Sequence, residues 1–277
     1  MGFTYCMSLT INSTAKLNNG ISVPRLGLGV YQIPPGKPTF NAVNFALNIG
    51  YKHIDTARIY GNESDVGETI GHSDVKRDEI FVTTKVWNSD QGYDSTLKAF
   101  DASLRRLGLS YIDLYLIHWP VQKEIVDTWK ALITLLKNGK VRSIGVSNYG
   151  INELNETIQN SDIIPAINQV EFHPFLFQKD LLQFCKRNAI QLEAYSPLTR
   201  GKRLNHPQLI ELGQKYNKSP AQILVRWSLQ HDLIVIPKSS HEERILENSR
   251  VFDFHINEKD METLNSCNED LRTVFLD

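Results

Sequence analysis

The sequence predicts an α/β protein, a (β/α)8 TIM barrel with an N-terminal β-hairpin and an extra C-terminal helix. Strand-like apolar runs alternate with helix-like segments eight times, and such units form a parallel sheet that can close into a barrel. The length of 277 residues is close to the roughly 250 residues typical of these barrels. No linker or change of composition divides the chain, so residues 1–277 are expected to form a single domain.

The hairpin is expected near the start of the chain. Asn18-Asn19-Gly20 separates the runs Ala15–Leu17 and Ile21–Val23. Alternating residues on both sides of an Asn-Gly pair are typical of two antiparallel strands joined by a tight turn.

Eight short apolar runs then supply the expected strands of the barrel. Several end in polar residues, and the C-terminal ends of parallel barrel strands converge on one opening, here called the mouth. The expected strands are Arg25–Gly29, Lys52–Asp55, Ile80–Lys85, Asp113–His118, Ser143–Ser147, Ala166–Glu171, Gln191–Tyr195 and Ile234–Pro237.

The segments between these strands have helical periodicity. Leu97, Phe100 and Leu104 recur at the spacing of one buried helix face, and Gly108 follows as a stop signal. The expected helices are Thr39–Asn48, Ser64–Ile70, Tyr93–Leu107, Val126–Asn138, Ile151–Gln159, Lys179–Arg187, His206–Tyr216 with Pro220–Gln230, Glu242–Asn248 and, as the extra helix, Asn257–Cys267.

The composition excludes several classes of partner. With 30 basic and 31 acidic residues, the net charge of -1 gives no basic surplus to attract nucleic acid or an anionic membrane. No apolar run approaches the roughly 18 residues of a spanning helix, and the start lacks a signal-peptide pattern. Cys6, Cys185 and Cys267 are an odd number and far apart, which favours free thiols in a reducing, cytoplasmic environment.

Four polar residues, here called the tetrad, lie at or just after predicted strand ends: Asp55, Tyr60, Lys85 and His118. The Lys85 ammonium is expected to lower the pKa of the Tyr60 phenol, and Asp55 to hold Lys85 in place. The phenol then hands a proton to a carbonyl oxygen, to which His118 donates a hydrogen bond.

Each member of the tetrad also has a structural interpretation, which for Tyr60 is packing against its neighbours. Asp55 and Lys85 are suited to a buried ion pair without a catalytic role, and His118 to a hydrogen-bonded place in the core. Convergence of all four at one mouth favours the catalytic interpretation. His53, two residues before Asp55 on the same strand, is expected to face the barrel interior, and no role is assigned to it.

Metal chemistry is poorly supported. The eight histidines form no HxH or HExxH motif and no close cluster with Asp or Cys, so no metal site is expected and a metal-dependent hydrolase is the weaker hypothesis. Gly27-Leu28-Gly29 begins like a Rossmann fingerprint, but Gln32 occupies the third glycine position and Pro34-Pro35 follows. These glycines instead indicate a close approach of the backbone to something bound at the mouth.

Two further groups of strand-end residues suggest a dinucleotide. Ser147, Asn148 and Gln169 offer hydroxyl and amide groups for a carboxamide, and Tyr195 offers a ring on which nicotinamide can stack. Lys238 and Arg244 flank Ser239-Ser240 just before a helix, a pattern suited to phosphate. The alternative for this last segment is a solvated helix start whose cations are offset by Glu242 and Glu243.

Together these segments resemble the aldo-keto reductase family along nearly the whole chain. The resemblance is to the bacterial and protozoal branch of glyoxal, diketogluconate and prostaglandin F synthase-like enzymes. The matching segments, in the family's order, are GLGVYQIP, GYKHIDTARIYGNE, TTKVWN, LGLSYIDLYLIHWP, IGVSN, NQVEFHP, AYSPL and IPKSSHEERILEN.

The resemblance implies a reductase that binds NADPH/NADP+ across the mouth and converts a small carbonyl substrate, such as methylglyoxal, glyoxal, an aromatic aldehyde or a keto-sugar, into an alcohol. Tyr60 would supply the proton. The implied cofactor residues are Gly29, Val30, Ser147, Asn148, Gln169, Tyr195, Ser196, Leu198, Lys238, Ser239, Arg244, Glu247 and Asn248. The implied substrate residues are Tyr31, Trp87, His118 and Trp119, and a monomer is expected.

Two departures from the family pattern bear on specificity. The chain ends soon after Leu271, whereas mammalian members carry a long C-terminal loop, so an open and less selective site is expected. Arg58 stands where the family has a small residue, and pairing with Glu63 is favoured over a role with acidic substrates. A redox-sensing binding subunit that keeps the cofactor site is the remaining alternative to an enzyme.

Overall fold

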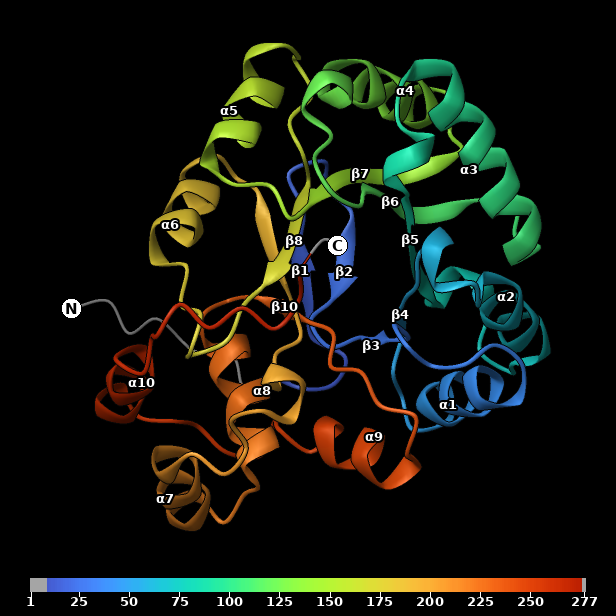
Figure 1. Ribbon diagram of the computed structural model, residues 1–277. Helices are drawn as coiled ribbons and strands as arrows, with labels where there is room; N and C mark the ends of the chain where they lie inside the picture. Colours follow the sequence, from blue (N-terminus) through green and yellow to red (C-terminus); the bar gives the residue numbers. More distant parts are fainter. Residues whose placement is uncertain (1–8, 276–277) are drawn as a thin grey trace.

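Eight parallel strands form a closed barrel in the computed structural model, which describes residues 9–275 (Figure 1). Each strand pairs with its neighbour in chain order, and parallel bridges join Leu26 to Val235 and Gly29 to Lys238 to close the barrel. The predicted (β/α)8 barrel is therefore confirmed. The strands are β3 (Leu28–Gly29), β4 (His53–Asp55), β5 (Phe81–Val86), β6 (Ile112–Ile117), β7 (Val141–Ser147), β8 (Ile167–Glu171), β9 (Gln191–Tyr195) and β10 (Ile234–Val235).

The first and last strands are shorter than the predicted runs Arg25–Gly29 and Ile234–Pro237. Residues around both strands are still hydrogen-bonded across the closure: Val235 donates to the Arg25 carbonyl at 2.8 Å, and Gly27 donates to the Val235 carbonyl at 2.9 Å. The apolar runs therefore located the closing strands correctly, but the pairing there consists of isolated bridges.

A ring of helices surrounds the barrel and covers the outer face of its strands (Figure 1). The predictions for α3, α5, α6 and α8 match at both ends, and the others differ by one or two residues at one end or both. Helices α7 and α10 pack beside each other outside this ring, and α10 is the predicted extra helix. The helices are α1 (Lys37–Asn48), α2 (Glu63–His72), α3 (Tyr93–Leu107), α4 (Ile125–Lys137), α5 (Ile151–Gln159), α6 (Lys179–Arg187), α7 (Pro207–Tyr216), α8 (Pro220–Gln230), α9 (Glu242–Ser249) and α10 (Glu258–Asn265).

The predicted hairpin forms from β1 (Thr14–Lys16) and β2 (Ser22–Pro24), which pair antiparallel. Asn18 donates to the Pro165 carbonyl and Asn19 to the Arg142 carbonyl, each at 3.0 Å, so the turn is fastened to the barrel. Its apolar side packs with residues inside the barrel, such as Phe81 and Leu114. The hairpin thus covers the end of the barrel where the strands begin.

Two further sequence features can be checked in the structure. In residues 9–275, no helix has the length and apolar character needed to cross a bilayer. Cys185 and Cys267 are free thiols, and Cys6 lies outside the described residues.

Candidate active site

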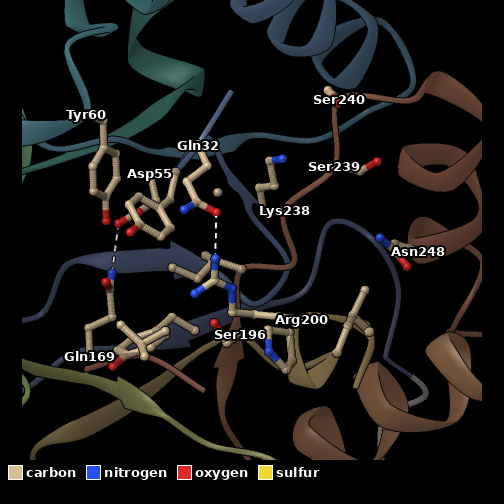
Figure 2. Close-up of a pocket in the computed structure, with 18 of the residues that line it drawn as sticks. Gln32, Asp55, Tyr60, Gln169, Ser196, Arg200, Lys238, Ser239, Ser240 and Asn248 are labelled. Carbon is tan, nitrogen blue, oxygen red and sulfur yellow. Dashed lines mark hydrogen bonds between the residues drawn. The ribbon is translucent and has the colours of Figure 1, made fainter. Parts of the chain in front are cut away.

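A cavity of about 830 Å³ lies at the C-terminal ends of the strands, where the sequence predicts the mouth. Figure 2 shows Tyr60, Asp55 and Gln169 on one side, Lys238, Ser239, Ser240 and Asn248 on the other, and Arg200 between them. The structure therefore brings most of the predicted site residues together. Those lining the cavity are Gly29, Tyr31, Asp55, Tyr60, Trp87, His118, Trp119, Ser147, Asn148, Gln169, Tyr195, Ser196, Leu198, Lys238, Ser239, Arg244, Glu247 and Asn248.

Two predicted residues do not line this cavity. Lys85 lies behind Asp55 and is fully buried. The Val30 side chain packs in the hydrophobic core, while its carbonyl accepts a hydrogen bond from Asn62 at 3.0 Å. The expectation that Val30 contacts a cofactor is not supported by this position, because its side chain faces the core.

Asp55 and Lys85 form the predicted ion pair at the ends of β4 and β5. The Lys85 Nζ donates to both Asp55 carboxylate oxygens, at 2.7 and 2.8 Å, and to the Thr56 carbonyl at 2.9 Å. Burial raises the pKa of Asp55, and the opposing charge of Lys85 and its hydrogen bonds counteract that rise. All three ammonium hydrogens of Lys85 therefore have hydrogen-bond acceptors, as a buried charge requires.

Tyr60 lies in the short helical turn Arg58–Tyr60 that follows β4. The Lys85 Nζ is 5.1 Å from the centre of the Tyr60 ring, and the phenol points toward Asp55 (Figure 2). Burial raises the Tyr60 pKa well above its ordinary value, and the negative charge of Asp55 adds to the rise. The expected lowering by Lys85 is therefore wrong in this structure, because burial and the Asp55 charge raise the Tyr60 pKa instead.

His118 follows β6 and is buried beside the Tyr60 and Trp87 rings, whose centres are 5.6 and 5.1 Å from its own. Burial lowers its pKa well below the ordinary value, and the positive charge of Lys85 contributes. The imidazole is therefore neutral at neutral pH. A neutral ring keeps one N–H, which is the form suited to donate a hydrogen bond to a carbonyl oxygen.

The amide and hydroxyl residues form a connected chain beside the tetrad. The Tyr195 hydroxyl donates to Asn148 Oδ1 at 2.8 Å, and Asn148 Nδ2 donates to the His118 carbonyl at 2.9 Å. Asn148 adopts a left-handed φ of 63°, which turns its side chain across the strand ends. Gln169 Nε2 donates to Asp55 at 2.7 Å, so this amide is held against the tetrad.

The other end of the cavity is cationic. Lys238, Arg244 and Arg200 line it, and no ion pair of any of the three is found within the described part of the chain. Burial lowers the pKa of Lys238, and the like charge of Arg200 contributes. Glu243 Oε1 lies 3.7 Å from His241 Nδ1, and no ion pair between Glu243 and Arg244 is found among residues 9–275. This arrangement fits a phosphate site better than an offset, solvated helix start.

Arg200 and Gln32 are site residues that the sequence reasoning missed. Arg200 Nη2 donates to Gln32 Oε1 at 2.8 Å, which links the loop after β9 to the loop after β3 (Figure 2). Arg200 stands two residues after the AYSPL segment, outside the segments that match the family. Its left-handed φ of 52° is a tertiary feature without a sequence signal.

The C-terminal tail is the second feature that was not foreseen. Val274 and Phe275 line the cavity, so the short tail still contributes to the site expected to be open. The Glu171 carboxylate holds the tail by accepting the backbone N–H groups of Thr273 and Val274, at 2.9 and 3.2 Å. The Thr273 hydroxyl also donates to Glu171.

Two expectations about individual residues are corrected. Arg58 pairs with Asp90 at 2.7 Å and not with Glu63, which is buried and paired with Arg106 at 2.6 Å. The Gly27 backbone lies close to His53 and not to a ligand. A Cβ added at Gly27 would lie 2.7 Å from a His53 ring atom. In residues 9–275 no group of three or more His, Cys, Asp and Glu side chains is placed to hold a metal ion.

Comparison with known proteins identifies the family to which this geometry belongs. The model of the aldo/keto reductase family matches residues 25–269. The chain belongs to the aldo/keto reductase family. The predicted family and the predicted class of enzyme, a reductase, are confirmed.

Relatives of this aldo-keto reductase belong to the predicted branch. It is 49% identical over 266 residues to glyoxal reductase of Bacillus subtilis (strain 168), with 96% of each chain covered. It is 51% identical over 259 residues to 9,11-endoperoxide prostaglandin H2 reductase of Trypanosoma cruzi (strain CL Brener), with 92% of each chain covered. The solved structure of a Gox0644 variant in complex with NADPH superimposes with a TM-score of 0.91 at 40% identity, covering 95% of this chain and 97% of that one.

Proposed function

We propose that this aldo-keto reductase uses NADPH to reduce small aldehydes and ketones to alcohols, with Tyr60 as the proton donor. The observation that carries the proposal is the tetrad at one end of a cavity whose other end is lined by cations without carboxylate partners among residues 9–275. Such a cavity suits a molecule with a flat carboxamide-bearing ring at one end and phosphates at the other.

The residues present fit NADPH. Ser147, Asn148 and Gln169 offer polar groups beside the Tyr195 ring, and Lys238, Arg244 and Arg200 offer positive charge for phosphate. When bound, NADPH supplies the hydride for the carbonyl carbon. Glu247 and Asn248 line the same end of the cavity and are proposed to lie near the adenine.

Tyr60, His118 and the Asp55–Lys85 pair divide the remaining work. Tyr60 gives its hydroxyl proton to the carbonyl oxygen, which completes the alcohol once the carbon has accepted the hydride. The neutral His118 donates a hydrogen bond to that oxygen and orients it. The Lys85 charge, held by Asp55, stabilises the negative charge that develops on the Tyr60 oxygen.

The substrate side of the cavity is mainly aromatic and apolar. Tyr31, Ile59, Trp87, Trp119 and Phe275 line it beside the tetrad. This lining favours small carbonyl compounds with little charge, including glyoxal, methylglyoxal and aromatic aldehydes, over keto-sugars. The name of the Bacillus subtilis relative, glyoxal reductase, supports the same substrate class. We further propose a single domain, a monomeric state and a cytoplasmic location.

The test is NADPH oxidation, followed at its absorbance band with methylglyoxal, glyoxal, aromatic aldehydes and keto-sugars, and repeated with NADH. We expect turnover with NADPH and a clear preference for it over NADH. A protein that binds NADPH tightly yet reduces none of these carbonyls would contradict the proposal and favour a redox-sensing binding subunit.

A further inference from the structure

Below the tetrad, a second carboxyl group lies inside the barrel. Glu193 on β9 is fully buried, and its Cα pairs in register with that of Gln169 on β8. It does not line the cavity. Nothing in the proposed reaction uses it, yet a carboxyl buried this deeply is costly unless its neighbours compensate for the loss of water.

Gln169 connects this carboxyl to the tetrad. Its Nε2 donates to Asp55 Oδ2 at 2.7 Å and to Glu193 Oε1 at 3.1 Å, which uses both amide hydrogens. Because the nitrogen must face these two carboxyl groups, the amide oxygen is directed away from them and toward the cavity that Gln169 lines. Glu193 Oε1 and Asp55 Oδ2 together therefore fix which side of the Gln169 amide faces the cavity.

We propose that Glu193 is a positioning residue of the reductase, acting as an uncharged acid that holds the Gln169 amide in place and, when it ionises, slows the reduction. This inference rests on the proposed function for its effect on turnover. As the neutral acid, Glu193 leaves Asp55 and Lys85 as a balanced pair beside Tyr60. As a carboxylate it adds one uncompensated negative charge to the buried cluster.

The groups around Glu193 favour the neutral acid. Asp55 and His53 approach from β4 and Lys85 from β5, whereas β8 contributes the neutral Gln169 and β10 pairs Ile234 opposite. His53 Nε2 is 4.0 Å from Glu193 Oε1, and burial lowers the His53 pKa to about 3, so the imidazole carries no charge to pair with. Burial and the Asp55 charge raise the Glu193 pKa to about 8, although Lys85 and Gln169 oppose the rise.

The charge on Glu193 acts on the proton donor. A carboxylate at position 193 raises the Tyr60 pKa further, in the same direction as Asp55. Negative charge develops on the substrate and Tyr60 oxygens as the proton moves, and a second negative charge nearby disfavours that state. Reduction therefore slows as pH rises through the Glu193 pKa of about 8.

The first experiment compares pH profiles of kcat between pH 6 and 10 for the wild type, Glu193→Gln and Asp260→Asn. In the wild type we expect kcat to fall as pH rises through the Glu193 pKa of about 8. Glu193→Gln keeps the shape and the hydrogen-bond acceptor but cannot titrate, so its kcat should not fall in this range. Asp260→Asn, the same kind of change on α10 and outside the cavity, should retain the fall, because hydrogen bonds from Lys215 and Tyr216 outweigh burial and lower the Asp260 pKa.

A second experiment needs neither cofactor nor turnover. The folded state binds a proton at Glu193 that the unfolded chain releases above its ordinary pKa of 4.5, so wild-type stability is lost as pH rises from that value to about 8. The thermal midpoint of Glu193→Gln, relative to wild type, should rise across this window and then level off. A difference that does not vary with pH would overturn the assignment of an uncharged acid.

A third variant tests the amide. Glu193→Met removes one of the two acceptors that hold the Gln169 amide and leaves only Asp55, so the amide is held less firmly. NADPH should therefore bind more weakly by tryptophan fluorescence quenching, while Glu193→Gln retains wild-type affinity. Equal affinity in both variants would overturn the positioning role. A wild type that reduces no carbonyl contradicts the proposed function alone, because the stability experiment still decides the state of Glu193.

Discussion

Lys85 is fully buried, yet its ammonium has three hydrogen-bond acceptors within 2.9 Å. The ion pair with Asp55 offsets the cost of removing both charges from water, and removing one partner of such a pair destabilises proteins by about 3–5 kcal/mol. At the same time the pair is electrically balanced, so it does not turn Tyr60 into a phenolate. The resting site therefore holds a protonated Tyr60 and a neutral His118, which is the state that reduction requires.

Replacing Tyr60 with Phe should lower kcat for carbonyl reduction by about 100-fold to 10,000-fold, because it removes the proton donor. NADPH affinity, measured by fluorescence quenching, should stay the same. Tyr115→Phe is the matched control, since its buried hydroxyl has no hydrogen-bond partner among residues 9–275. Wild-type turnover in the Tyr60→Phe protein would show that another group donates the proton.

Replacing Arg244 with Met should raise the KM for NADPH about 10-fold to 100-fold, the size expected for one lost charge-assisted hydrogen bond to phosphate. The KM for NADH should change little, because NADH lacks the 2′-phosphate. Arg250→Met, at the exposed C-terminal end of α9 and outside the cavity, is the control. Equal effects on both cofactors would mean that Arg244 does not read the 2′-phosphate.

At the scale of elements, the contact between α2 and the end of α3 depends on one glycine. A Cβ added to Gly67 would lie 1.9 Å from the Leu107 carbonyl oxygen, and the atoms it meets are backbone. The two helices can approach this closely because the side chain is absent. In the chain, α2 directly follows the turn that carries Tyr60.

Gly67→Ala should therefore lower the free energy of unfolding by about 1–3 kcal/mol through overpacking. Gly71→Ala, in the same helix with nothing within 4 Å of its added Cβ, should instead be neutral or stabilise by up to about 1 kcal/mol. Thermal unfolding of both variants measures the difference. Equal midpoints would show that α2 shifts to accept the methyl group without cost.

At the scale of the whole molecule, the barrel joins residues from all parts of the chain into one cavity. Its closure places Lys238 beside Gly29, and the tail carries Val274 to the same opening. A ligand that spans this opening contacts loops of several barrel units at once, so its binding should stabilise the entire fold.

NADPH at about 100 times its Kd should stabilise the protein by about 2.7 kcal/mol, which corresponds to a rise of roughly 5–11 °C in Tm. Differential scanning fluorimetry measures the shift, and NADH at the same concentration should give a smaller one. If Arg244→Met weakens NADPH binding 10-fold to 100-fold, that protein should keep only about 1.4 to 0.4 kcal/mol of this stabilisation at the same NADPH concentration. The absence of any shift with NADPH would contradict the proposed cofactor site.

The sequence alone determined the order of the elements and the residues at the strand ends. Alternation of apolar runs and amphipathic segments is a local property, so the boundaries of α3, α5, α6 and α8 were predicted correctly. Parallel barrel strands end at a common mouth, which is why the sequence alone predicts that the tetrad residues lie together. The same reasoning predicted the polar residues at the end of IGVSN and within NQVEF.

Only the tertiary structure decided the charges and the partners of the buried residues. The pKa of Tyr60, the pairing of Arg58 with Asp90 and the link from Arg200 to Gln32 depend on distances between segments far apart in the chain. Glu193 gave no sequence signal, since a glutamate in a strand is unremarkable until the barrel closes around it. Desolvation and electrostatic interactions act through space, so they become determined when the barrel brings these groups together.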